Sequence, residues 1–245
     1  MTNPSQATVR FERIKAVTFD VYGTLIDWES SIPKLISPWL RESGVVVSDE
    51  LILSTFAANQ KRHQIVRPAL RYTEVLRRTY LDLESSFGLE PDEGRAIQFS
   101  HSVGAWDAFD DTVAALRQLN TTCLIGILSN VDNESFERTR PKLGVPLAIK
   151  VTAEDVGSYK PDVAHFEESL RQCRELGIGK QELLHVAWSR HHDVEPCQKL
   201  GLASVWIDRR HGKKGPGATM PSDAVPDLTL KTLAELAALH RAACR

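Results

Sequence analysis

The chain has 245 residues, enough for one α/β domain together with a smaller helical unit. Hydrophobic residues make up 42% and charged residues 25% of the chain, and the formal net charge is -2. This balance provides no strongly cationic surface, so we expect neither nucleic-acid nor membrane partners. No apolar run approaches the length of a membrane span.

The cysteines and the first residues favour a reduced, cytoplasmic protein. Cys123, Cys173, Cys197 and Cys244 are scattered and lack the spacing of a metal site. Residues 1–11 are polar and contain no apolar signal segment.

Five short apolar, β-branched runs, bounded by polar or turn residues, predict buried strands. They cover residues 15–20, 123–130, 148–152, 183–188 and 203–208. Helical periodicity over 111–119, 163–176 and 228–242 places helices between or after them, with Asp110 or Asp111 as the first N-cap. This alternation predicts a Rossmann-like, doubly wound parallel sheet with helices on both faces. A basic run over 209–214 in a Gly-rich stretch predicts a solvated loop.

A long helical insertion separates the first two strands. Residues 32–40, 51–65 and 72–83 have apolar stripes at helical spacing, and no convincing strand lies among them. We therefore predict a core domain of residues 12–28 and 104–245, and a helical cap domain of residues 29–103. Because ligands bind at the carboxyl ends of parallel strands, this cap should form a lid over the site.

The residue with the clearest chemical role is Asp20, which ends the first strand. Gly23 allows a sharp turn just after it, and Thr24 places a hydroxyl close to the carboxylate. An ordinary turn or N-cap aspartate would explain Asp20 taken alone equally well.

Further polar residues end or follow the later strands. Ser129 and Asn130 end the second, Lys160 follows a turn after the third, and Asp193 follows the fourth. Each has a plain surface explanation alone, but together they bring acid, hydroxyl and cation to one crevice.

The order of these segments resembles the four motifs of the haloacid dehalogenase superfamily, and most of all its 2-haloacid dehalogenases. The resemblance covers nearly the whole chain. The segments are FDVYGTLID (residues 19–27), LSN (128–130), YKP (159–161) and LLHVAWSRHHD (183–193), followed by WIDR (206–209).

Two departures separate the chain from the phosphatases of that superfamily. Those enzymes have a general-acid aspartate where this chain has Tyr22, and a further Mg²⁺-binding acid where it has Ser189. Halide leaves without a proton, so dehalogenation suits a site without these acids. The resemblance thus implies no metal and no cofactor; Mg²⁺ would be needed only if the chain were a phosphatase.

The resemblance implies that Asp20 attacks the carbon of a short 2-haloalkanoic acid and forms an aspartyl ester, which water then hydrolyses. Lys160 would keep Asp20 ionised, and Asp193 would balance Lys160 and help activate the water. Ser129, Asn130 and Thr24 would position the substrate carboxylate or Asp20.

The residues that receive the leaving group are less clear from the sequence. The halide-binding arginine of the relatives aligns with Asn59, so the candidate cations are Arg62, Arg67, Arg71 and Arg190. Tyr22, Ser189 and Trp106 are further candidates for the pocket, with hinge packing the alternative for Trp106.

Three family positions in the later motifs also differ. Phe166 replaces a family tyrosine, and core packing explains it best; Trp188 replaces a family serine, and Arg190 a family asparagine. His191 or His192 could orient the water, although a structural role is the commoner one.

Three functions stay open: a dehalogenase of small carboxylates, a Mg²⁺-dependent phosphatase of a small phosphate ester, and a non-enzymatic binding protein. The joint presence of Asp20, Ser129, Lys160 and Asp193 argues against the third, because a binding protein needs none of them. The sequence leaves the oligomeric state open, with a homodimer as one option.

Overall fold

A six-stranded parallel sheet forms the centre of the molecule. The computed structural model describes residues 9–213, 215 and 217–244; residues 1–8 of the expected polar N-terminus and Lys214 of the basic run lie outside this range. The strand order is β3-β2-β1-β4-β5-β6. The strands are β1 (Ala16–Phe19), β2 (Leu124–Ser129), β3 (Ile149–Thr152), β4 (Leu183–Ala187), β5 (Ala203–Ile207) and β6 (Leu228–Leu230).

All five predicted strands are confirmed, and so is the doubly wound topology. The chain moves outward from β1 to β3, then returns to the other side of β1 for β4 to β6. The site therefore lies at the carboxyl end of β1, where the strand order reverses and a crevice opens.

Ten α-helices accompany the sheet in the part of the chain that the structure describes. The inserted helices, which follow β1, are α1 (Trp28–Glu42), α2 (Asp49–Gln64), α3 (Tyr72–Ser86) and α4 (Glu93–Ser100). The core helices are α5 (Thr112–Leu119), α6 (Asn133–Thr139), α7 (Ala153–Val156), α8 (Ala164–Glu175), α9 (Glu195–Leu200) and α10 (Leu233–Ala243). Short 3-10 turns cover Phe11–Arg13, Val103–Ala105, Arg140–Leu143 and Lys180–Glu182, and a π-helical turn covers Arg190–Val194.

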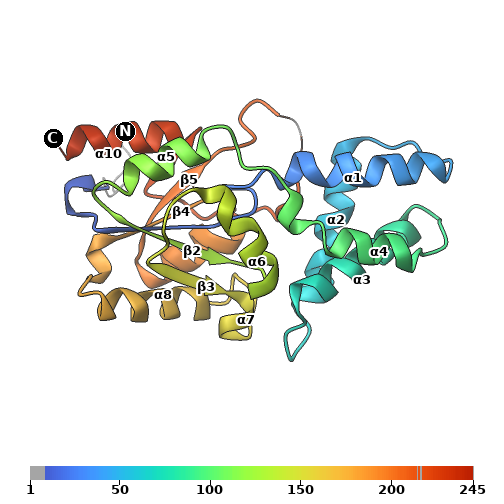
Figure 1. Cartoon of the computed structure of the whole chain (residues 1–245), viewed down its shortest axis with the longest axis horizontal. Coiled ribbons are helices and arrows are strands. Elements are labelled where there is room, and N and C mark those ends of the chain that lie inside the picture. Colours follow the sequence, from blue (N-terminus) through green and yellow to red (C-terminus); the bar gives the residue numbers. More distant parts are fainter. Residues whose placement is uncertain (1–8, 214, 216, 245) are drawn as a thin grey trace.

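The helices bury apolar faces on both sides of the sheet. Figure 1 shows α5 and α10 side by side along one face and α8 along the other. Leu116 and Leu236 belong to the larger core cluster, whereas Phe166 and Cys173 of α8 belong to a separate, smaller cluster. The two clusters are the two sides of one sheet, which explains why the strands are apolar on both faces.

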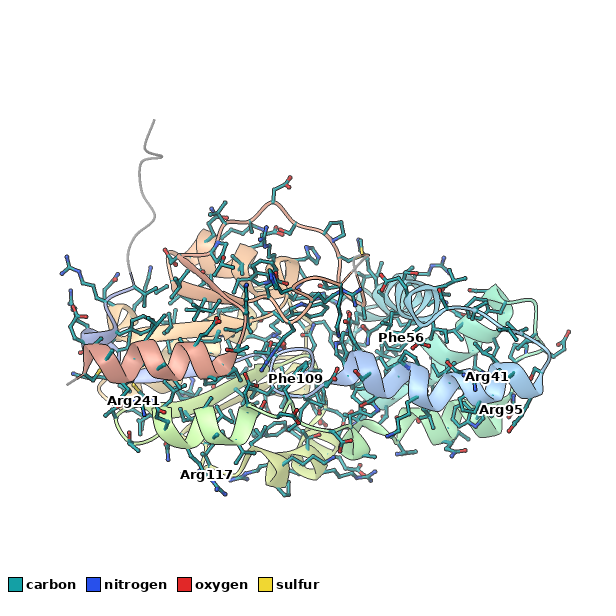
Figure 2. The ribbon with its side chains drawn as sticks, turned by 90° about the horizontal axis from the view of Figure 1, so that it is seen from above. Arg41, Phe56, Arg95, Phe109, Arg117 and Arg241 are labelled. Atoms are coloured by element: carbon teal, nitrogen blue, oxygen red, sulfur yellow. The ribbon has the colours of Figure 1, made fainter. Side chains whose placement is uncertain are left out.

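The inserted helices form their own group beyond the end of β1 (Figure 1). Phe56, Phe99 and Tyr80 pack edge-on or tilted at the centre of this group, with ring centroids 5.6–5.9 Å apart. Figure 2 shows Arg41 and Arg95 toward its outer end, away from Phe109 and Arg117 of the core.

Two expectations about the C-terminal segment were wrong. The helix expected over 228–242 begins only at Leu233, because Leu228–Leu230 pairs with β5 as an edge strand. The basic run is not simply solvated either. Arg209 binds Asp111 at 2.9 Å, and Arg210 binds Glu29 at 2.6 Å and Glu50 at 2.7 Å.

The bond to Arg209 also changes the role expected for Asp111. This residue is the N-cap of α5, but its side chain makes no cap hydrogen bond there. It binds Arg209 and the backbone N–H of Leu233 instead, so it joins α5 to the start of α10.

Candidate active site

Asp20 lies in the loop that follows β1, and neighbouring residues of this loop fix its carboxylate. The Thr24 hydroxyl donates to Oδ2 of Asp20 at 2.8 Å and accepts from the backbone N–H of Trp188 at 2.9 Å. Gly23 makes this turn with φ +100°, and a Cβ there would lie 2.6 Å from the Trp188 ring. Only glycine fits this conformation and this close approach, so Gly23 fixes the path of the loop.

Lys160 joins the two carboxylates of the site. Its ammonium donates to Oδ1 of Asp20 at 3.0 Å, to Oδ1 of Asp193 at 2.6 Å and to the Leu128 carbonyl at 2.8 Å. The lysine is 2% exposed, so these three acceptors use all its donors away from water. The three charges sum to -1, which leaves the centre one cation for two anions.

Burial and neighbouring charges shift the pKa values of Asp20 and Asp193 in opposite directions. Burial raises the pKa of Asp20 above its usual range, and Lys160 offsets only part of that shift. Burial also opposes ionisation of Asp193, but Lys160 and His185 outweigh it and hold the pKa of Asp193 well below its usual range. Asp193 is thus the permanent counter-ion, while Asp20 is the more basic carboxylate and hence the better nucleophile.

A buried chain of hydrogen bonds supports Asp193 from behind. His185 Nε2 lies 3.0 Å from Oδ1 of Asp193, and His185 Nδ1 lies 3.0 Å from the Thr18 hydroxyl. A neutral ring with its proton on Nε2 donates to Asp193 and accepts from Thr18, which satisfies both atoms. Thr18 and His185 are paired across β1 and β4, so the sheet itself sets this chain.

The site opens into a small cavity of about 40 Å³. Its walls combine the charged centre with four aromatic rings and several neutral polar groups. The lining residues are Asp20, Tyr22, Trp28, Gln60, Gln64, Tyr72, Ser129, Asn130, Lys160, Trp188, Ser189, His192, Asp193, Ala218 and Thr219. A cavity of this size accepts only a small molecule.

Four predicted site residues line the cavity with their roles modified. The Tyr22 ring faces it, but its hydroxyl is bonded to Thr139 at 2.9 Å. Asn130 clamps the backbone of Lys160, accepting from its N–H at 2.7 Å and donating to its carbonyl at 3.1 Å. Ser189 lies 2.9 Å from the hydroxyl of Thr219. The Ser129 hydroxyl is buried and has no partner among the described residues.

The prediction that arginines supply the cation for the leaving group in the Asp20 pocket was wrong. Arg190 stacks on Trp206, with its guanidinium carbon 3.9 Å from the ring centroid, and faces a neighbouring cavity. Arg71 pairs with Glu154, Arg67 binds backbone carbonyls, and Arg62 is exposed. Among the residues that the structure describes, no arginine lines the Asp20 cavity.

Two aromatic residues prove to be packing groups. Trp106 packs against Tyr22 and Trp28, with ring centroids at 5.6 and 6.5 Å, and is not among the residues that line the Asp20 cavity, which favours the packing alternative. Phe166 is fully buried in the smaller core cluster and packs edge-on against His185. Asn59, at the family's arginine position, is buried and donates to Ser86.

The donors present do not fit a Mg²⁺ ion. In the described part of the cavity wall, the only carboxylates are Asp20 and Asp193, and the Lys160 ammonium already lies between them. Ser189 offers a hydroxyl where a third acid would be needed. Mg²⁺ requires octahedral oxygen ligands, commonly with several carboxylates, and an ammonium at that point repels it.

His185, which supports Asp193 from behind, was missed by the sequence analysis, and so were several residues that line the cavity. His185 interrupts an otherwise apolar strand, which is the kind of signal that marks a buried polar partner. Gln60 and Gln64 stand four residues apart on one helix face, and Tyr72 was counted only as part of an apolar stripe. Their distance from Asp20 in the sequence hid their place in the site.

Comparison with known proteins agrees with this geometry. A family model described as haloacid dehalogenase-like hydrolase matches residues 14–187. The chain is 26% identical to an (S)-2-haloacid dehalogenase of Pseudomonas putida over 92% of this chain and 96% of that protein. It is 24% identical to a phosphoglycolate phosphatase of Yersinia pestis over 89% and 90%. A solved L-2-haloacid dehalogenase is 25% identical, with a TM-score of 0.75, over 94% and 99% of the two chains.

Proposed function

Because the chain belongs to the haloacid dehalogenase-like hydrolases, we propose that it displaces halide from a short 2-haloalkanoic acid. Asp20 is the nucleophile, and the reaction passes through a covalent aspartyl ester. The named activity of the Pseudomonas putida relative, which matches almost end to end, supports this substrate class.

One observation discriminates this function from phosphate-ester hydrolysis. The position that would need a general acid holds Tyr22, whose hydroxyl is turned away from Asp20 to Thr139. Burial also raises the pKa of Tyr22 above its usual range, so the phenol does not release a proton readily. An alkoxide that leaves in the first step, when Asp20 attacks, would lack a proton donor at this position, whereas halide needs none.

The first half-reaction follows from the hydrogen bonds of Asp20. Lys160 and Thr24 each hold one carboxylate oxygen, so the group is ionised and cannot rotate. In line with the carbon–halogen bond, an Asp20 oxygen forms a bond to the substrate carbon while the halide leaves with the bonding electrons. The product is an ester of Asp20 and a free halide ion.

The second half-reaction needs a water and a base near the ester carbonyl. Oδ2 of Asp193 is buried and has no hydrogen-bond partner in the described structure, so it is free to accept a hydrogen bond that orients the water. His192 also lines the cavity, and burial lowers its pKa to about 4, which keeps its ring neutral at pH 7. The water attacks the ester carbonyl carbon while the neutral His192 ring takes one of its protons and returns it to the departing alkoxide oxygen, so the 2-hydroxy acid is released, and loss of the second proton restores the Asp20 carboxylate.

The substrate carboxylate has a natural partner in Ser129. Its hydroxyl lines the cavity, and a buried donor without a partner costs about 1–3 kcal/mol unless a ligand satisfies it. We assign Ser129 to the substrate carboxylate on this ground, with Asn130 positioning Lys160.

Halide release from 2-chloropropionate and 2-bromopropionate tests the activity, and a single turnover in ¹⁸O-labelled water tests the mechanism. Attack on the ester carbonyl puts the heavy oxygen first into Asp20, so the first molecule of product is unlabelled. Label in the product of the first turnover would show that water attacks the substrate directly, with Asp20 as a general base.

Several wider properties are proposed with the activity. We propose the division into a core of residues 12–28 and 104–245 and a cap of residues 29–103, supported by the position of the inserted helices as a group beyond one end of the sheet. No helix in the described ranges is both long and apolar enough to cross a membrane. We propose a cytoplasmic enzyme without a cofactor, supported by the free thiols of Cys123, Cys173, Cys197 and Cys244; a homodimer stays a prediction.

A further inference from the structure

The direction of the displacement determines where the halide leaves. In an in-line attack the leaving group departs on the side of the carbon opposite the nucleophile. Asp20 stands at the end of the sheet, and the inserted helices lie beyond that end (Figure 1). Their residues in the cavity wall are Trp28 of α1, Gln60 and Gln64 of α2, and Tyr72 of α3.

None of these four residues is a cation, so neutral donors must receive the departing charge. Gln60 uses one N–H to donate to the Tyr72 hydroxyl at 3.1 Å. That bond occupies a lone pair of the Tyr72 oxygen and leaves its proton free, because no acceptor for it is found in the described residues. Burial raises the pKa of Tyr72 above its usual range, so the phenol stays protonated.

Packing holds the Tyr72 ring in place. It is 2% exposed and lies against Tyr22, with centroids 6.4 Å apart and planes at 23°. A donor held in this way needs no reorganisation when charge develops on the leaving atom, which is the condition for effective electrostatic catalysis.

Trp28 provides a second donor from the neighbouring helix. The residue is 7% exposed, and its Nε1 is fully buried without a hydrogen-bond partner among the described residues. Phe56 and Trp106 fix its ring, with centroids 5.8 and 6.5 Å away. An unpaired buried N–H is costly, and its position in the wall of the reaction cavity indicates a ligand that completes it.

We propose that the Tyr72 hydroxyl and the Trp28 indole N–H together receive the leaving halide, with Gln60 orienting Tyr72. This inference rests on the proposed function and replaces the arginine of the relatives with two neutral donors. Since hydrogen-bond acceptance weakens from chloride to bromide, the loss of a donor should slow displacement of chloride more than that of bromide.

The matched variants are Tyr72→Phe and Tyr80→Phe. Both remove one buried hydroxyl from α3, but that of Tyr80 binds Glu84 at 2.8 Å and does not face the cavity. Single-turnover ester formation from 2-chloropropionate should fall about tenfold to a hundredfold in Tyr72→Phe, a little less than for loss of an oxyanion donor. The chloride-to-bromide rate ratio should fall too, while ester hydrolysis and the ratio in Tyr80→Phe should not change. Equal slowing of both halides, or of both half-reactions, would overturn the proposal.

A binding measurement tests the proposed halide site independently of the proposed activity. If the wild type releases no halide, the proposed function fails. Bromide quenching of tryptophan fluorescence still tests the halide site formed by Tyr72 and Trp28. Saturable quenching that weakens in Tyr72→Phe but not in Tyr80→Phe supports the site. Trp28→Phe should weaken the quenching, with Trp188 of the cavity wall as the remaining reporter, and lose the chloride preference. Absence of saturable quenching in the wild type contradicts the inference.

Discussion

The ammonium of Lys160 lies 3.0 Å from Oδ1 of Asp20, although 140 residues separate the two in the chain. A further bond of 2.6 Å ties the same ammonium to Asp193. Lys160 thereby favours the ionised form of a buried carboxylate, at the cost of desolvating three charges. The predictions below follow from this centre and from the groups packed around it.

Replacing Lys160 by Met should remove both activity and stability. It leaves Asp20 and Asp193 as buried carboxylates without a cation, which costs about 3–5 kcal/mol of unfolding free energy. Urea unfolding measures this loss, which should shrink at pH 4 as Asp20 becomes protonated. A loss that does not depend on pH would contradict the electrostatic role and point to packing.

Asp20→Asn should abolish turnover and raise stability at pH 7. The amide cannot form the ester, so halide release should fall about 10⁴-fold or more. The raised pKa of Asp20 means that the folded state binds its proton more tightly than the unfolded state does. The contribution of Asp20 to the free energy of unfolding is therefore greatest at low pH and falls as the pH rises through the pKa of Asp20 in the folded state. The variant should melt above the wild type at pH 7 and level with it at pH 4.

Removing divalent metal should not affect halide release. Lys160 occupies the point between Asp20 and Asp193 where a cation would sit. We expect equal rates from 2-chloropropionate in EDTA and in millimolar Mg²⁺. Activity that needs Mg²⁺, accompanied by phosphate release from phosphoglycolate, would instead establish the phosphatase alternative.

His165→Leu should stabilise the protein, most of all at acidic pH. His165 is fully buried on α8, and neither ring nitrogen makes a hydrogen bond within the described residues. Burial, together with the charge of Lys160, lowers its pKa to about 3. Stability is therefore lost as pH falls from 6.5 toward 3, by about 2 kcal/mol at pH 5. Urea midpoints at pH 8 and pH 5 measure the difference, and an equal gain at both would contradict the linkage.

Glu29→Gln should loosen the inserted helices from the core. Arg210 of the loop after β5 binds Glu29 of α1 and Glu50 of α2, and the first pair is nearly buried. Weakening it should increase amide hydrogen exchange in α1 and α2 and cost about 1–3 kcal/mol locally. The control is Glu42→Gln, which breaks an exposed pair with Arg95 at the outer end of α1 and should cost under about 1 kcal/mol. Identical exchange in the two variants would show that the Arg210 contact does not hold the inserted helices.

The site positions that follow strands were predictable from the sequence. Asp20, Ser129, Lys160 and Asp193 each end or follow a run with period-two or continuous apolar character, and parallel strands bring their carboxyl ends to one edge. The rule that parallel strands end at one edge does not depend on how individual side chains pack. For that reason the sequence predicted five strands and the group of polar residues at their carboxyl ends. The prediction failed at β6, where three residues with helical spacing pair with β5 because that edge of the sheet was open.

The wall opposite Asp20 was decided only by the tertiary structure. Periodicity shows that Tyr72 and Trp28 are buried, but it cannot show which other buried groups they face. The orientation of α1, α2 and α3 depends on packing among Phe56, Tyr80 and Phe99, and on the ion pairs of Arg210 with α1 and α2. These contacts place neutral residues of the inserted helices in the wall of the Asp20 cavity and leave the nearby arginines outside it. The charges in the sequence suggested that arginines line the pocket. In the folded protein, the orientation of each helix decides which of its side chains line the cavity.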